Sequence, residues 1–265
     1  MKNKIDNIIK ETEDYLKSIN RFYGNAFYVD KQLESLSDEN MAESKKNITE
    51  DSSKRDNKPL VEVDLFGNVI ARREEWEFTE TLDEMYSMIN ECQKCTLGKS
   101  RIKFVFGVGD PNADIVMIGE APGADEDAQG EPFVGRAGKL LNKILEAIDF
   151  KREEVYICNI LKCRPPGNRN PLPEEISTCE PYLKKQLDLI KPKLILILGK
   201  VAADTLLNLR QPLNKMRGQI LNYNGIRTMV TFHPAALLRN PNWKRPAWED
   251  MQKFKKLYEE LKENQ

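Results

Sequence analysis

The chain has 265 residues with a formal net charge of −1; 40% of the residues are hydrophobic and 31% are charged. This length fits one α/β domain with an extension or two small domains. No apolar run approaches the roughly 20 residues that span a bilayer, which excludes a membrane-spanning helix. The N-terminal stretch interleaves acids with apolar residues and lacks the continuous apolar core of a secretory signal, so we expect a cytoplasmic protein.

Charge is divided unevenly along the chain. Residues 1–80 contain 13 Lys and Arg against 18 Asp and Glu, a net charge of −5, whereas residues 81–265 contain 28 against 24, a net charge of +4. A mildly basic second part is compatible with contacts to phosphates but does not require them.

Residues 1–80 carry no pattern that suggests chemistry. Apolar residues recur at helical spacing over 2–20 and predict an amphipathic helix. Residues 38–58 contain almost no apolar side chains, which is typical of a disordered linker. We therefore expect an N-terminal helix and linker over 1–80, followed by a folded domain over 81–265.

In the folded domain, short strand-like runs alternate with helix-period stretches. The runs that predict strands are 113–121, 154–161, 193–199 and 227–232. The stretches that predict helices are 137–148, 173–190, 200–209 and about 243 to the end. This alternation indicates a parallel sheet covered on both faces. Sites in such sheets gather at the carboxyl ends of the strands, which here are Glu120–Gly123, Asn159–Arg164, the residues after Leu198, and His233.

The cysteines are candidate ligands of a metal centre. Their odd number, with no export signal, argues against a disulfide framework. Cys92 and Cys95 form a C-x2-C pair, and Cys163 and Cys179 lie far downstream. Four thiolates in this spacing suit either zinc or a [4Fe–4S] cluster, and spacing alone does not choose between them. Cys158 lies inside an apolar strand and is interpreted as a small buried hydrophobic residue.

Several residues near the strand ends are candidate site residues, although each also has an ordinary structural explanation. Glu120 is either a solvated loop acid or an acid placed in a site at the end of a central strand. Phe133 is a packing residue or a stacking platform for a planar ring. Asn159 is a turn former or a reader of a base edge through its amide donor and acceptor. His233 is the only histidine in the chain and ends the last apolar run.

The segment after His233 has the composition of a wedge for DNA. Leu237 and Leu238 are followed directly by Arg239. Apolar side chains beside an arginine on an exposed loop can insert into a base stack.

These motifs together resemble a known family. The segments GEAPGADED (119–127), PFVGRAG (132–138), CNILKCRPPGNRNP (158–171) and HPAALLRNP (233–241), with the C-x2-C pair and Cys179, closely resemble the family 4 uracil-DNA glycosylases, the iron–sulfur branch of their superfamily. The similarity covers about residues 84–261. It implies a three-layer α/β/α sandwich around a short parallel sheet, in agreement with the strand and helix pattern.

The resemblance also implies a set of site residues. Catalysis would involve Glu120, Glu126 and His233, with the relative weight of the two acids left open. Uracil would be bound by Ala121, Gly123, Phe133 and Asn159. DNA would be contacted by Leu237, Leu238 and Arg239. A structural [4Fe–4S] cluster would be held by Cys92, Cys95, Cys163 and Cys179.

The implied reaction is base flipping followed by hydrolysis of the N-glycosidic bond of uracil, which leaves an abasic site for base excision repair. No lysine nucleophile is implied, so the abasic strand should stay uncut. We expect a monomer that acts on uracil-containing DNA without a membrane or a nucleotide cofactor, and whose N-terminal helix is open to an unknown protein partner. A branch that bonds covalently to DNA through a second histidine is disfavoured because this chain has one histidine.

Two other functions are compatible with parts of the sequence. A DNA-binding accessory protein could keep the fold and cluster without the chemistry, but it would be free to lose the acids, Phe133, Asn159 and His233. A zinc-stabilised nucleotide-binding domain is the second alternative. The chain has no G-x-x-x-x-G-K-[ST] motif, so such a domain would not use a P-loop.

Overall fold

The computed structural model describes residues 62–63, 69–70 and 73–263. The helix expected over 2–20 and the linker expected over 38–58 lie outside the described residues. The strands are β1 (Glu62–Val63), β2 (Val69–Ile70), β3 (Val108–Gly109), β4 (Ile115–Gly119), β5 (Tyr156–Asn159), β6 (Leu194–Leu198), β7 (Ile220–Tyr223) and β8 (Ile226–Thr231). The α-helices are α2 (Leu82–Ile89), α3 (Leu97–Ser100), α4 (Ala124–Gln129), α5 (Arg136–Ala147), α6 (Pro173–Ile190), α7 (Lys200–Leu207), α8 (Leu213–Met216), α9 (Pro234–Arg239) and α10 (Lys244–Glu263).

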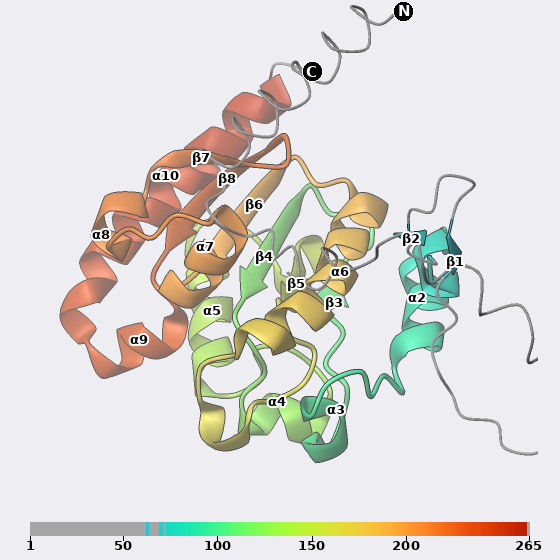
Figure 1. Cartoon of the computed structure of the whole chain (residues 1–265). Coiled ribbons are helices and arrows are strands. Elements are labelled where there is room, and N and C mark those ends of the chain that lie inside the picture. Colours follow the sequence, from blue (N-terminus) through green and yellow to red (C-terminus); the bar gives the residue numbers. More distant parts are fainter. Residues whose placement is uncertain (1–61, 64–68, 71–72, 264–265) are drawn as a thin grey trace, which may run out of the picture. The chain divides into compact units, whose positions relative to one another are not determined.

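A six-stranded sheet with the order β3-β5-β4-β6-β8-β7 forms the centre of the domain (Figure 1). Its four inner strands are parallel and coincide with the four strands that the sequence predicts. The two edge strands are antiparallel to their neighbours, so the sheet is mixed rather than purely parallel. β1 and β2 form a separate antiparallel pair.

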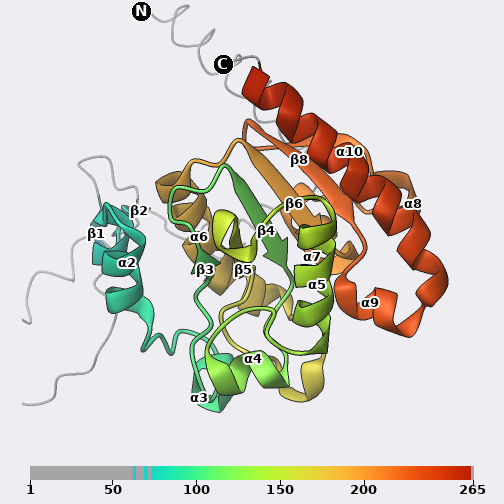
Figure 2. The same ribbon diagram turned by 180° about the vertical axis from the view of Figure 1, so that it is seen from behind.

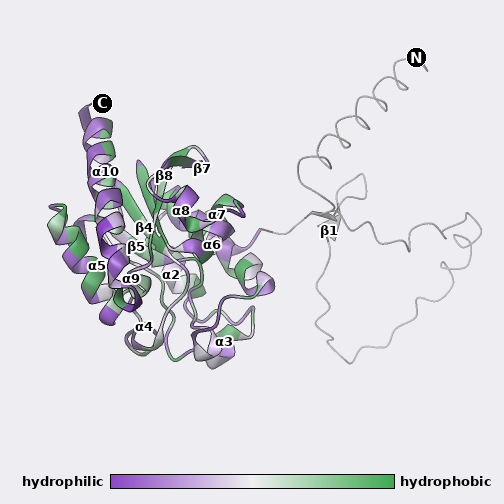
Figure 3. Ribbon diagram, turned by 90° about the vertical axis from the view of Figure 1, so that its left-hand side faces the viewer, coloured by the Kyte–Doolittle hydropathy of each residue, from purple (hydrophilic) through white to green (hydrophobic). Residues whose placement is uncertain are grey.

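The inner strands are buried on both faces, which explains their continuous apolar sequence. Every residue of β4, β5 and β6 is buried, including those at the ends of the strands. Alternate residues along each strand therefore face opposite layers. In Figure 3 the strands are coloured as hydrophobic, whereas the helices carry hydrophilic residues as well.

Helices cover both faces of the sheet, as the two hydrophobic cores show. One core joins Val116 and Ile118 of β4 to α2, α6 and α7. The other joins Ile115 and Met117 of the same strand to α5 and α10. Figures 1 and 2 show α6 and α7 on one side of the sheet and α5 and α10 on the other. The predicted three-layer α/β/α fold is confirmed.

The packed structure begins before residue 81. Trp76 lies in a short 3₁₀ helix, Glu75–Phe78, and is buried. Its ring meets Tyr182 of α6 edge to face, with 4.7 Å between the ring centroids. Residues 75–78 therefore pack with the folded domain, although they precede the expected boundary at 80/81. Among the described residues, no helix is both long and apolar enough to cross a membrane.

Candidate active site

A cavity of about 620 Å³ opens at the carboxyl ends of the four parallel strands. The loop after β4 contributes Glu120–Gly123, and the end of β5 contributes Asn159. Gly199–Val201 follow β6, and Phe232 and His233 follow β8. Its other lining residues are Glu126, Phe133, Ala137, Pro165, Asn168, Arg169, Asn170, Leu198, Leu213, Ala235, Ala236, Arg239 and Trp243. The strand ends that the sequence singles out thus surround one cavity.

Phe133, Asn159 and His233 converge in this cavity. The rings of Phe133 and His233 lie 5.5 Å apart, centroid to centroid, at 33°. Gly119, the last residue of β4, makes the convergence possible. A Cβ atom on Gly119 would lie 2.7 Å from Cζ of Phe133 and would also collide with Oδ1 of Asn159. Phe133 and Asn159 therefore both occupy the space beside Gly119 that a side chain would fill.

Asn159 presents an unsatisfied amide to this region. The side chain is 2% exposed, and its Oδ1 atom has no hydrogen-bond partner among the described residues. A buried polar atom without a partner costs free energy, so most such atoms are paired. A ligand whose edge offers a donor beside an acceptor would satisfy the Asn159 amide.

His233 is held as a neutral hydrogen-bond donor. It caps helix α9, where its Nδ1 atom accepts a hydrogen bond of 3.2 Å from the backbone N–H of Ala235. Burial, assisted by the charge of Arg239, lowers the pKa of His233 to about 4. The neutral ring therefore carries its proton on Nε2. Gly199, at φ 97°, lets the imidazole lie close to the end of β6, because a Cβ there would be 2.9 Å from Cβ of His233.

The two candidate acids have different surroundings. Burial raises the pKa of Glu120 above its usual value, and no other described residue bonds to its carboxylate. Glu126 instead accepts hydrogen bonds of 3.1 Å each from the backbone N–H groups of Gly123, Val134 and Gly135. These bonds tie the loop after β4 to the loop before α5. Glu120 is therefore the acid with oxygens free for a ligand, and Glu126 positions the cavity wall.

Of the three residues expected to contact DNA, Leu237 is buried and cannot insert into a base stack. Leu237 is 2% exposed and packs with Phe232 and Ala247, so it belongs to a small core under the loop. Leu238, by contrast, is 37% exposed, and Arg239 is exposed and lines the cavity. The helical turn of α9 separates the two leucines because neighbouring residues on a helix point in different directions.

The sequence analysis did not single out two residues that line the cavity, although one of them, Lys200, lies in the stretch expected after Leu198. Trp243 is 41% exposed, and its ring stacks on Phe232 with 5.1 Å between centroids at 23°. Lys200 follows β6 and forms an ion pair with Asp204 one helical turn further along α7. Trp243 follows an Asn-Pro-Asn turn outside any periodic pattern, and a single lysine at a helix start is not distinctive. Only the fold reveals that both reach the cavity.

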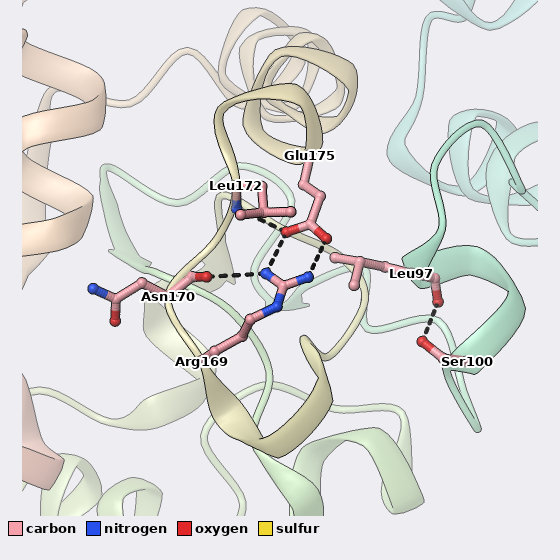
Figure 4. Close-up of polar contacts among 6 residues, drawn as sticks. All are labelled: Leu97, Ser100, Arg169, Asn170, Leu172 and Glu175. Carbon is pink, nitrogen blue, oxygen red and sulfur yellow. Dashed lines mark hydrogen bonds and ion pairs between the residues drawn. The ribbon is translucent and has the colours of Figure 1, made fainter.

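The basic loop Arg164–Pro171 is fixed to the start of α6. Arg169 makes two hydrogen bonds, of 2.9 and 2.6 Å, to the carboxylate of Glu175, and a third, of 3.0 Å, to the carbonyl of Asn170 (Figure 4). Glu175 also accepts a bond from the N–H of Leu172, and Arg169 holds the pKa of Glu175 below its usual value. This paired geometry fixes one wall of the cavity.

Other cysteines help to raise the pKa values of Cys163 and Cys179, whereas no other cysteine acts on Cys158. Burial raises the pKa of Cys163 to about 11, and the charges of Cys95 and Cys92 add to the rise. Burial raises the pKa of Cys179 to about 12, again with contributions from Cys163 and Cys95. The pKa of Cys158 is raised by burial alone, and no other cysteine contributes. Thiols of this kind become thiolates when a metal compensates their charge.

The donor set therefore fits a sulfur-ligated centre chemically. It comes from three segments: the turn between α2 and α3, the residue Cys163 after β5, and Cys179 on α6. In the described part of the chain, however, no three potential ligands converge closely enough to define a metal site. The geometry of a bound centre is thus not defined by these side chains.

The cavity brings an aromatic ring, an amide, a neutral imidazole and a carboxylate together at the carboxyl ends of parallel strands, an arrangement of an α/β enzyme suited to a planar ring. Comparison with known proteins gives the family. The model described as the uracil DNA glycosylase superfamily matches residues 106–262. This chain belongs to that superfamily and, within it, to the type-4 uracil-DNA glycosylases.

Three relatives support the assignment to the type-4 uracil-DNA glycosylases. The chain is 42% identical over 186 residues to a type-4 uracil-DNA glycosylase of Archaeoglobus fulgidus, which covers 67% of this chain and 94% of that protein. It is 42% identical over 185 residues to the type-4 enzyme of Saccharolobus solfataricus, covering 66% and 86%. It is 40% identical over 187 residues to that of Sulfurisphaera tokodaii, covering 67% and 85%.

Proposed function

We propose that this chain removes uracil from DNA by hydrolysis of the N-glycosidic bond and leaves an abasic site for base excision repair. The convergence of Phe133, Asn159 and His233 beside Gly119 carries the proposal. This arrangement offers one aromatic face, one amide edge and one neutral N–H donor to the same bound ring. A base inside a duplex cannot reach it, so the target nucleotide must flip out of the stack.

Asn159 and Phe133 recognise the flipped base. The unpaired Oδ1 of Asn159 accepts from N3–H of uracil, and its Nδ2 donates to O4. Cytosine presents the opposite polarity at these two atoms, so binding it would leave buried groups unsatisfied. Phe133 stacks on the ring, and the backbone of Ala121–Gly123 lines the adjoining wall.

His233 and Glu120 serve the bond cleavage. As the C1′–N1 bond breaks, its electron pair moves into the uracil ring and negative charge develops on O2. The Nε2–H of His233 donates to O2, which stabilises the leaving base most when the charge is greatest. Glu120 orients the water that attacks C1′ of the oxocarbenium-like sugar and accepts its proton. Glu126 acts through the loops that it holds.

The mouth of the cavity contacts the DNA backbone and the gap in the stack. Arg239 and Lys200 line the cavity and supply positive charge for phosphates. The exposed Leu238 enters the space that the flipped nucleotide leaves. No lysine is assigned as a nucleophile, so we expect the abasic strand to stay intact.

We assign a [4Fe–4S] cluster to Cys92, Cys95, Cys163 and Cys179. The charges of Cys95 and Cys92 help to raise the pKa of Cys163, and those of Cys163 and Cys95 help to raise that of Cys179, which supports this assignment. When bound, the cluster supplies a covalent cross-link between three segments of the chain and no step of the hydrolysis. We also infer that the protein acts in the cytoplasm as a monomer, with any protein partner bound through the N-terminal helix.

A strand-cleavage assay tests the function. Purified protein is incubated with a duplex that contains one uracil, and with the same duplex containing thymine or cytosine, without added metal or nucleotide. Free uracil should be released, and the uracil strand should break only after alkali. A uracil strand that stays intact after alkali at enzyme excess would refute the proposal. Breakage before alkali would refute the monofunctional assignment.

A further inference from the structure

Lys162 is a buried residue for which the proposed reaction has no role. It is completely buried, with 0% exposure, three residues beyond Asn159 and directly before Cys163. A lysine loses hydration when it is buried, and such residues are almost always paired. Within the described part of the chain, no carboxylate forms an ion pair with Lys162. Its amino group is instead committed to neutral acceptors.

One of these acceptors belongs to the residue that reads the base. The Nζ atom of Lys162 donates a hydrogen bond of 2.8 Å to the backbone carbonyl of Asn159 and another of 2.6 Å to Oε1 of Gln186. Gln186 is also completely buried, and its Nε2 atom donates at 3.1 Å to the carbonyl of Phe106 and to the hydroxyl of Tyr156. The Asn159 backbone is thereby anchored through Lys162 to helix α6.

The main chain of Lys162 is fixed as well. Its N–H donates to Sγ of Cys179 at 3.3 Å, and its carbonyl accepts from the N–H of Val105 at 2.9 Å. Every hydrogen-bonding group of this residue is therefore directed at the end of β5, the α6 helix or the segment before β3. The residue links a cysteine assigned to the cluster with the amide that faces the cavity.

We propose that Lys162 is a positioning residue that sets the orientation of Asn159 for reading the base. This inference rests on the proposed function. It follows from the geometry: the carbonyl of Asn159 is held from behind by Nζ, while the side-chain amide of the same residue remains unsatisfied toward the cavity. Loss of the Nζ bond would remove one support of the Asn159 carbonyl, while the N–H groups of Ile160 and Leu161 stay bonded to β4 and the residue after it, and would let the amide shift.

The test compares two ligands that depend differently on Asn159. Free uracil contacts the amide, whereas an oligonucleotide with a tetrahydrofuran abasic site contacts the DNA surface without a base. Lys162→Met keeps an unbranched side chain, one heavy atom shorter, and removes its donors. Tyr156→Phe is the matched control, because it removes a hydroxyl from the same buried network without touching the carbonyl of Asn159. Iron content and thermal melting are measured for each variant.

Lys162→Met should weaken binding of free uracil about tenfold, the effect of losing two buried hydrogen bonds to the base. Its affinity for the abasic oligonucleotide and its iron content should stay within about twofold of wild type, and Tyr156→Phe should resemble wild type in all readouts. If Lys162→Met does not fold, Gln186→Met replaces it, because it removes the second anchor of Nζ. The expected direction is the same.

The inference is overturned if the folded variant binds uracil as wild type does, or if uracil and abasic affinity fall together. It is also overturned if Tyr156→Phe loses as much uracil affinity as Lys162→Met, because the network would then act only through stability. Wild-type protein that releases no uracil from DNA would refute the proposed function instead. The two failures are therefore distinguishable.

Discussion

The Nδ1 atom of His233 accepts a hydrogen bond of 3.2 Å from the backbone N–H of Ala235, two residues along the chain. This bond fixes more than the start of α9. It occupies the only acceptor of the neutral imidazole, so the remaining Nε2–H can serve only as a donor. Because burial lowers the pKa of His233 to about 4, the ring is neutral at pH 7. A neutral donor gains strength as negative charge develops on the leaving base.

His233→Ala should slow excision because the donor to uracil O2 is lost. Removing one such donor costs about 10²–10³-fold in rate, or roughly 3–4 kcal/mol. DNA affinity should change little, since the interaction is strongest in the transition state. Single-turnover excision and equilibrium binding are the two measurements. A variant within about threefold of the wild-type rate would remove His233 from the mechanism.

The free energy of unfolding should depend on pH because of the same histidine. The unfolded chain binds a proton to His233 near pH 6.5, whereas the folded chain binds it only near pH 4. The unfolded state therefore binds more protons between these values, and stability falls as the pH falls. From about pH 7.5 to about pH 5, wild type should lose about 2 kcal/mol relative to His233→Gln. Urea unfolding of both proteins at the two pH values measures this difference; equal losses would contradict it.

Glu120 should set the acid limb of the rate profile. Its carboxylate must be ionised to accept the proton of the attacking water, and burial raises its pKa above the usual value of a glutamate. As the solution becomes more acidic, the excision rate should therefore begin to fall at a higher pH than an ordinary glutamate would give. Glu120→Gln should be slow and largely insensitive to pH in this range. Glu126→Gln is the comparison. If the fall in rate at acidic pH is lost in Glu126→Gln and kept in Glu120→Gln, the base is Glu126.

The fold could be read from the sequence where one pattern dominates. The four inner strands are continuous apolar runs because they are buried on both faces, and α6 spans 173–190 as predicted. The edge strand β7 was missed because it alternates exposed and buried residues and has no such run. The sequence feature that could have revealed β7 is the Asn224–Gly225 pair, whose positive φ angles suit a tight hairpin to β8.

The site was predictable in location but not in detail. Strand ends could be located from apolar runs, which is why Glu120, Asn159 and His233 were placed at strand ends, where they line the cavity. The direction of a side chain was not encoded in the motif, so Leu237 and Leu238 looked alike, although only Leu238 is exposed. The network of Lys162 depends on contacts across more than twenty residues, and no local spacing reports it.

The N-terminal boundary of the folded domain should lie before Trp76. The Trp76 side chain is buried against Tyr182, whose hydroxyl donates at 3.2 Å to Sγ of Cys92. Trp76→Ala should cost about 3–5 kcal/mol and lower iron content, because it leaves a cavity beside the cysteines. Phe78→Ala is the matched control, since Phe78 lies in the same short helix but is 65% exposed.

Two truncations test the same boundary. A protein that starts at Arg73 should retain uracil excision, whereas one that starts at Thr79 lacks Trp76 and should be less stable. Thermal melting and iron content compare them. If the two truncations melt at the same temperature, Trp76 does not contribute to the fold as its burial suggests.

The cysteines should separate into four that hold iron and one that does not. Replacing Cys92, Cys95, Cys163 or Cys179 by Ser should bleach the protein and destabilise it, because ligand binding contributes free energy of folding. Cys158→Ala should keep its colour, since Cys158 lies within β5 and no other cysteine affects its pKa. Alanine is the matched change there, because a serine hydroxyl in that buried strand would need a partner. Iron per protein and visible absorbance measure the outcome. Zinc in place of iron would refute the cluster, and bleaching by Cys158→Ala alone would show that the ligand set is wrong.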